Sequence, residues 1–272
     1  MDGRRTAFVL LLTLVSGCAS LRPTPQLPVA NSVALDQLVI YGDFELPEEH
    51  RILRQLNQMR GQIAGQLGLQ VTQEPIHVYL FKTPKRYRAF LNSHFPGFPD
   101  RRAIFEQTDT RLAVYAHWGD RIAEDLRHEV AHGYIHAAVP SIPMWIDEGL
   151  AEYFEVAGPR PGMNRPHLEQ LLTAMRNGSW QPNVARLERL REVQDMQQIE
   201  YAEAWAWAHL LLETSPERRA LLQGYLADLS SGRPGEALST RILRSEADPN
   251  GLLLAYLEKL APALNSAAGN SE

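Results

Sequence analysis

Two histidines and a glutamate in the segment from Arg127 to Glu155 have the types and the spacing that a catalytic metal site requires. His128, Glu129 and His132 form the pattern H-E-x-x-H. On a helix, residues four positions apart lie on one face, so both imidazoles can reach one ion. Glu129 would lie beside them, close enough to take a proton from a metal-bound water. The pattern arises by chance about 0.02 times in a chain of this composition, so it predicts a metal centre only together with a helix and a third ligand.

The third ligand is expected from the segment that follows. Catalytic zinc takes three protein ligands and keeps a fourth position open. Residues 120–138 have the apolar spacing of a helix, and Asp120 is a good residue to cap its start. A proline-containing turn then ends this helix, and a second helix fits residues 144–156. If the two helices fold back on each other, Glu148 returns to the histidines.

The segment resembles the gluzincin metallopeptidases, which include thermolysin and the relatives of aminopeptidase N. In the aminopeptidase branch, the third zinc ligand is a glutamate in a W-x-x-E-G-x-A-x-Y-like motif, which residues 145–153 match. The compact peptidase-MA-like proteins of bacteria are a similar group. The resemblance implies one zinc ion held by His128, His132 and Glu148, with Glu129 as the general base. The segment from His132 to Glu148 is shorter than in the aminopeptidases, so the turn must be tighter.

The resemblance implies roles for two further residues. Glu152 lies four residues after Glu148, and a carboxylate at that offset in thermolysin-like enzymes orients a zinc histidine. The alternative is an exposed helix glutamate. Tyr201 begins a segment that is similar to the Tyr-x-x-Gly-x-Ala helix start of the aminopeptidase branch, whose tyrosine stabilises the oxyanion. Ala204 replaces the glycine, and a buried core tyrosine is the alternative.

Residues 1–17 have the features of a bacterial lipoprotein signal peptide. Arg4 and Arg5 precede an apolar stretch over residues 7–15, and residues 15–18 (VSGC) resemble a lipobox. The apolar stretch is too short to span a bilayer. We therefore expect cleavage before Cys18, the only cysteine of the chain, and a lipid anchor on it. Ala19 follows Cys18 in place of the aspartate that often retains bacterial lipoproteins in the inner membrane, so the resemblance to these lipoproteins implies an outer-membrane location facing the periplasm. Residues 18–32 would form a proline-spaced tether.

The remaining sequence predicts an α+β, zincin-like peptidase domain over residues 33–262, followed by a flexible tail over residues 263–272. Residues 33–118 predict a small mixed or antiparallel sheet with helices, and residues 119–262 predict a mainly helical lobe. From the resemblance, residues 112–116 are expected to form the sheet edge that binds substrate by strand addition. The alternative is a plain structural hairpin.

Apolar periodicity, prolines and glycines predict the individual elements of both lobes. Strands are expected over residues 38–41, 76–81, 103–107 and 112–117. Besides the two helices of the metal segment, helices are expected over residues 47–67, 83–94, 166–176, 184–191, 201–214, 216–229 and 252–260.

Composition and motifs favour an enzyme without a nucleic-acid partner. The net charge is −5 and the pI about 6.0, and the chain has no P-loop, dinucleotide glycine pattern or serine elbow.

We expect a membrane-anchored zinc metallopeptidase acting on a peptide or protein substrate, with a zinc-bound water and a glutamate general base. The aminopeptidases that the segment resembles carry a Gly-x-Met-x-Asn motif that anchors the free amine of the substrate. This motif is absent upstream of His128, which favours an endopeptidase. The alternatives are a non-catalytic zinc-binding envelope scaffold or chaperone, and a zinc hydrolase of a cell-wall amide. The oligomeric state is not indicated.

Overall fold

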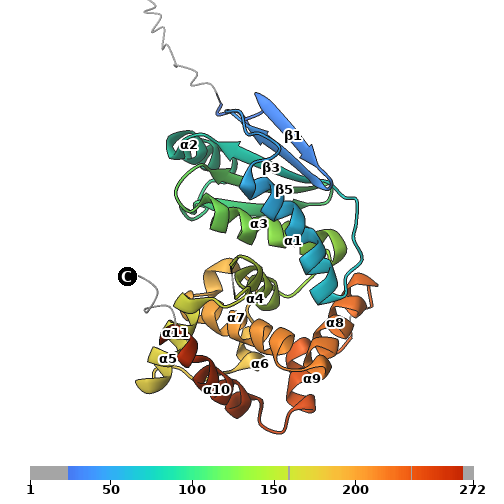
Figure 1. The fold of residues 1–272 in the computed structure, drawn as a ribbon, viewed down its shortest axis with the longest axis vertical. Coiled ribbons are helices and arrows are strands. Elements are labelled where there is room, and N and C mark those ends of the chain that lie inside the picture. The colour runs from blue at the N-terminus through green and yellow to red at the C-terminus, as the bar shows by residue number, and fades with distance from the viewer. Residues whose placement is uncertain (1–23, 159, 234, 266–272) are drawn as a thin grey trace, which may run out of the picture.

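The computed structural model describes residues 24–158, 160–233 and 235–265. The expected signal peptide, the lipidation site at Cys18 and the end of the expected tail lie outside the described residues. The described chain has the α+β fold that the sequence predicted, with a mixed sheet in its N-terminal part and a mainly helical C-terminal part (Figure 1). None of the described helices is both long and apolar enough to cross a membrane.

A sheet in the order β1-β2-β3-β5-β4 forms the N-terminal part of the described chain. Its strands are β1 (Asn31–Leu35), β2 (Leu38–Gly42), β3 (Ile76–Phe81), β4 (Ala103–Thr108) and β5 (Arg111–His117). The strands β2, β3 and β5 are parallel, and each outer strand is antiparallel to its neighbour. Because β5 pairs with β3 on one side and with β4 on the other, the prediction that residues 112–116 form the sheet edge is wrong. The edge strand on this side of the sheet is β4, and β1 forms the other edge.

Helices cover both faces of this sheet. They are α1 (Arg51–Leu67), α2 (Pro84–His94) and α3 (Ile122–Ala138). Alternate side chains of β3 belong to different clusters: Ile76, Val78 and Leu80 pack in the main core with α1 and α3, whereas Tyr79 and Phe81 pack with α2. Helix α3 contacts the sheet on one side and the C-terminal helices on the other, so it lies between the two parts of the molecule (Figure 1).

The C-terminal helices are arranged around one buried pair, α4 and α7. The helices are α4 (Met144–Phe154), α5 (Arg165–Arg176), α6 (Val184–Leu187), α7 (Gln198–Glu213), α8 (Pro216–Ser230), α9 (Leu238–Ser245), α10 (Pro249–Leu260) and α11 (Pro262–Asn265), with a 3-10 turn η1 (Val193–Asp195). Helix α7 is buried along nearly its whole length. A Cβ atom on Gly149 would lie 2.4 Å from the carbonyl oxygen of Ala204, so glycine is needed where α4 crosses α7. This close crossing fixes the helix that carries Glu148.

The sequence pattern does not predict β1, α9 or the 3-10 turn η1. It also does not predict α11, whose residues 263–265 lie in the range that was expected to be a flexible tail. Strand β1 begins at Asn31, inside the range 18–32 that was assigned to the tether, and pairs with β2 through a tight turn in which Asp36 has a φ of 49°. Aspartate tolerates this left-handed conformation better than most residues. Helix α9 is short and begins after Ala237 without a side-chain cap, so its start carries none of the usual sequence signals.

Several helix starts or ends also differ from the predictions. Helix α1 begins at Arg51 rather than at residue 47, and α10 begins at Pro249 rather than at residue 252. Helix α6 ends at Leu187 rather than at residue 191. Helix α7 begins at Gln198, three residues before Tyr201, because Gln197 and Glu200 form a capping box. The predicted cap at Asp120 is wrong: the residue at the start of α3 is Arg121, and no side chain caps this helix.

Candidate metal centre

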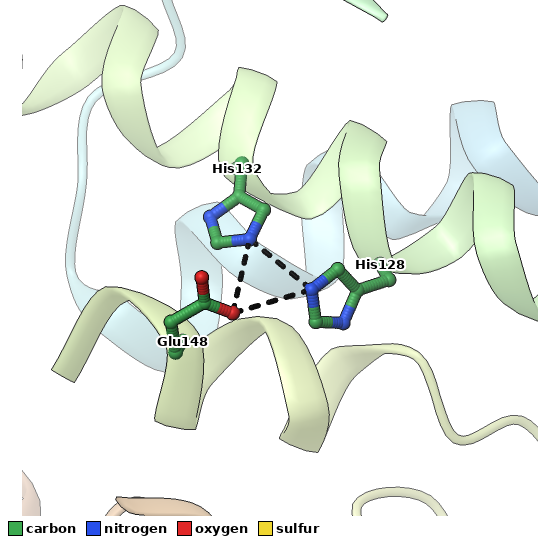
Figure 2. Close-up of side chains that lie close together, drawn as sticks. All are labelled: His128, His132 and Glu148. Atoms are coloured by element: carbon green, nitrogen blue, oxygen red, sulfur yellow. Dashed lines mark hydrogen bonds and ion pairs between the residues drawn. The ribbon is translucent and has the colours of Figure 1, made fainter. Parts of the chain in front are cut away.

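The two histidines of the H-E-x-x-H pattern project from α3 toward α4 (Figure 2). Leu126 and Val130 are fully buried and anchor α3 against the core. His128 and His132 lie one turn apart on the face that meets α4, and their Nε2 atoms are 3.3 Å apart. Two ring nitrogens at this distance require a shared proton or a shared ion between them.

Glu148 reaches the same point from α4 (Figure 2). The chain reverses between Ala138, the last residue of α3, and Met144, the first residue of α4. Glu148 Oε2 then lies 3.4 Å from Nε2 of His128 and 3.7 Å from Nε2 of His132. The structure therefore brings together the three residues that the sequence predicted as metal ligands.

The donor atoms of this cluster suit a zinc ion. The ligand atoms of His128, His132 and Glu148 all lie within 4.8 Å of one another. Glu148 is only 6% exposed, and its Oε2 atom is buried without a hydrogen-bond partner in the described structure. Buried polar atoms are normally satisfied, so an orphaned oxygen between two imidazoles marks a place for a cation. Two nitrogens and one oxygen form a donor set typical of catalytic zinc.

The pKa values of Glu148 and His132 reflect the strong electrostatic coupling between the carboxylates and the imidazoles of the cluster. Burial alone would raise the pKa of Glu148, but its contacts with His128 and His132 outweigh burial and lower the pKa to about 2. Burial alone would lower the pKa of His132, but Asp147 and Glu148 raise it to about 10. The low pKa of Glu148 favours its ionised form, which is the form that binds a metal ion.

A second carboxylate lies at the far nitrogen of each histidine. Glu155 Oε2 is 3.0 Å from Nδ1 of His128, and Asp147 Oδ2 is 3.0 Å from Nδ1 of His132. Such partners fix the ring orientation and the tautomer, leaving Nε2 free for a metal. Asp147 also contacts Nε2 of His136 at 2.8 Å.

Glu152 does not have the role that the sequence predicted. Its carboxylate contacts Nε2 of His167 at 2.8 Å and accepts a hydrogen bond of 3.1 Å from Asn164. The carboxylate that contacts His128, a candidate metal ligand, is Glu155, three residues further along the chain. Glu155 lies seven residues after Glu148, so two full helical turns return it to the same face. Glu152, four residues after Glu148, shares this face, so the spacing alone does not distinguish the two glutamates.

A cleft of about 860 Å³ opens beside the cluster and is lined by both His128 and Glu129. Glu129 itself is only 8% exposed. Burial raises the pKa of its carboxyl group, although the two neighbouring histidines act in the opposite direction. Ala103 of the edge strand β4 lines the same cleft, and Phe105 of β4 stacks on His132 with 5.8 Å between ring centroids. The sheet edge therefore lies next to the metal centre.

Tyr201, in the first turns of α7, is buried and hydrogen-bonded to an arginine that the sequence analysis did not identify. Arg101 Nη2 donates to the Tyr201 hydroxyl at 3.0 Å. Burial raises the pKa of Tyr201, and the negative charge of Glu148 raises it further. Arg101 lies in the loop before β4 and belongs to no motif, which explains why sequence reasoning missed it.

The comparisons with known proteins give little functional information. Residues 122–236, less than half of the chain, match a family described as "Protein of unknown function (DUF1570)". No curated protein matches the chain. The crystal structure of an M1 zinc metallopeptidase from Deinococcus radiodurans aligns with 17% identity and a TM-score of 0.41, over 85% of this chain and 51% of that one. The chain thus spans about half of the length of that protein. The chemistry of the site must be argued from its own geometry.

Proposed function

We propose that this protein is a zinc metallopeptidase that hydrolyses peptide bonds in a peptide or protein substrate. The observation that carries this proposal is the convergence of His128, His132 and Glu148 on one point, with the buried carboxyl group of Glu129 beside them at the wall of a cleft. Metal binding alone does not require Glu129. Its position in the cleft therefore favours a hydrolase over a scaffold.

His128, His132 and Glu148 would hold the ion, leaving a side open to the cleft. Zinc in such a site lowers the pKa of a bound water toward about 7 and polarises a carbonyl group. Glu129 would accept a proton from the attacking water and deliver it to the leaving nitrogen. Its raised pKa suits a group that must both take and release this proton.

Tyr201 is proposed to donate a hydrogen bond to the oxyanion. Because its oxygen already accepts from Arg101, its own proton remains available for another acceptor. A donor held ready before the reaction stabilises developing negative charge without reorganisation. Strand β4, whose outer edge is unpaired among the described strands, would hold the substrate main chain by strand addition.

The test of this proposal is cleavage of a mixed peptide library by a soluble form that starts after Cys18, followed by mass spectrometry. We expect the zinc-loaded wild type to cleave and the Glu129→Gln variant to retain zinc but to lose at least about 100-fold in rate. Internal cleavage would support an endopeptidase. If neither protein cleaves any peptide, the non-catalytic scaffold or the hydrolase of a cell-wall amide becomes the better account.

We also propose that a lipid on Cys18 anchors the protein in the bacterial envelope, at the outer membrane facing the periplasm. The support is the lipobox-like segment at residues 15–18. Metabolic labelling with a palmitate analogue should mark the wild type and not a Cys18→Ala variant. Labelling that survives this substitution would contradict the proposal.

A further inference from the structure

Arginines gather around the metal cleft, and Arg101 differs from the others in its partners. The arginines that line the cleft are Arg101, Arg102, Arg121, Arg127 and Arg165. Arg102 forms a bidentate ion pair with Asp125, and Arg121 pairs with Glu124. The other two bind backbone carbonyl groups: Arg127 that of Glu155, and Arg165 those of Ala263 and Leu264.

Arg101 has no carboxylate of its own among the described residues. Its single hydrogen bond there goes to the neutral Tyr201 hydroxyl. The preceding residue, Asp100, forms an ion pair with Arg88 instead. A partly buried guanidinium with five donors and one neutral partner retains most of its capacity to bind an anion.

The negative charges that Arg101 does face belong to the catalytic cluster. Burial alone would lower the pKa of Arg101, but Tyr201, Glu148 and Glu129 raise it. Glu148 is committed to the metal and Glu129 to the proton of the attacking water in the proposed mechanism. Neither of them forms an ion pair with Arg101 in the described part of the chain, so the guanidinium remains open to another anion.

The position of Arg101 makes its guanidinium accessible to a ligand at the metal. It lines the cleft that contains His128 and Glu129, and it also lines a neighbouring pocket of about 570 Å³. This second pocket is largely apolar, with Phe95, Phe98 and Met196 in its wall. Arg101 is the one lining residue that the two share, so it can contact a substrate that occupies both.

We propose that Arg101 is an anion-binding residue that takes a carboxylate group of the substrate beside the scissile bond. The proposal rests on the peptidase function argued above. Guanidinium and carboxylate groups match in a bidentate geometry, which gives both orientation and discrimination. The carboxylate could be the C-terminus of the substrate or the side chain of an aspartate or glutamate. In the first case the enzyme cleaves near the carboxyl end of its substrate, and in the second it remains an endopeptidase.

The experiment compares matched peptides derived from a sequence that the wild type cleaves. One pair differs only by a free C-terminal carboxylate or an amide, and a second set replaces each acidic side chain by its amide. We expect one carboxylate to raise kcat/KM by about 30-fold or more in the wild type. Arg101→Gln should abolish this preference mainly through KM, and Arg101→Lys should restore part of it. Arg102→Gln is the matched control, because Arg102 lines the same cleft but is paired with Asp125, and it should keep the preference.

Binding to the zinc-loaded Glu129→Gln protein, measured by calorimetry, separates this proposal from the proposed function. If the wild type cleaves no peptide, the peptidase proposal fails. The matched acid and amide peptides are then derived from library peptides that the Glu129→Gln protein binds. A preference of this protein for the carboxylate forms, lost on adding Arg101→Gln, would still support the anion site. Equal binding of acid and amide forms would overturn it. A uniform fall of kcat for all peptides in Arg101→Gln, with the preference for the carboxylate forms retained, would also overturn it, because it would show that Arg101 acts only on the transition state through Tyr201.

Discussion

Glu155 Oε2 lies 3.0 Å from Nδ1 of His128, on the side of the imidazole ring opposite to the nitrogen that faces Glu148. The ring is thus held between two carboxylates from one helix, of which one is suited to bind the metal and the other to orient the ligand. Burial raises the pKa of Glu155 to about 7, with Glu152 adding to the effect and His128 opposing it. The 3.0 Å contact with His128, and not the number of residues from Glu148, identifies Glu155 as the orienting carboxylate.

The first prediction separates Glu155 from Glu152. We expect Glu155→Gln to weaken zinc affinity by about 10- to 100-fold, because loss of an orienting carboxylate reduces the basicity and order of a zinc histidine. Glu152→Gln is the matched control, and it should change zinc affinity less, since Glu152 contacts His167. Competition with a chromophoric chelator gives both affinities. A larger loss in Glu152→Gln than in Glu155→Gln would contradict the assignment.

The second prediction concerns the glycine that follows Glu148. Gly149→Ala would place a Cβ atom 2.4 Å from the backbone oxygen of Ala204, so α4 and α7 must separate. We expect a loss of about 1–3 kcal/mol in the free energy of unfolding, together with weaker zinc binding because Glu148 moves with its helix. Urea denaturation measures the first effect.

Gly65→Ala on α1 is the control for the substitution itself. No atom lies within 4 Å of a Cβ at this position. Alanine is the better helix former, so this variant should be stabilised by about 0.5–1 kcal/mol. If both variants lose stability equally, close packing of α4 on α7 is not the cause.

The third prediction is a pH dependence that does not involve the metal centre. Burial lowers the pKa of His209 to about 4, although Glu213 opposes this, whereas an unfolded histidine titrates near 6.5. The folded protein therefore resists protonation of His209. The stability associated with the neutral ring is present above about pH 6.5 and is lost as the pH falls toward 4, by about 3 kcal/mol in total.

A His209→Asn variant isolates this contribution. Nδ1 of His209 lies 2.7 Å from the Tyr256 hydroxyl, so asparagine keeps a polar group in this position. We expect the difference in unfolding free energy between the wild type and the variant to shrink between pH 6.5 and pH 4. A difference that stays constant over this range would show that His209 does not titrate as expected.

Local patterns in the sequence predicted much of the fold and the core of the site. A helix is enough to place His128 and His132 on one face, and a tight chain reversal after it is enough to bring Glu148 to them. Short-range periodicity in the sequence was therefore sufficient to predict that these three residues meet. The α+β fold followed from the same kind of pattern, because alternating and helical apolar spacings are clearly separated along the chain.

Long-range geometry decided what the sequence could not predict. The order of β4 and β5 depends on which strand of a hairpin pairs with β3, and both strands have similar patterns. The choice between Glu152 and Glu155 depends on how α4 crosses α3. Arg101 comes from a loop distant in sequence from the histidines, so only the folded chain brings it to Tyr201.

The most direct test of the central claim is the zinc stoichiometry of the purified protein, measured by mass spectrometry of the metal after dialysis. We predict one zinc per chain in the wild type and in Glu129→Gln, and a strong loss in His132→Ala and Glu148→Ala, with unchanged circular dichroism as the control for folding. A wild type that binds no zinc, or variants that keep a full equivalent, would contradict a metal centre made by His128, His132 and Glu148.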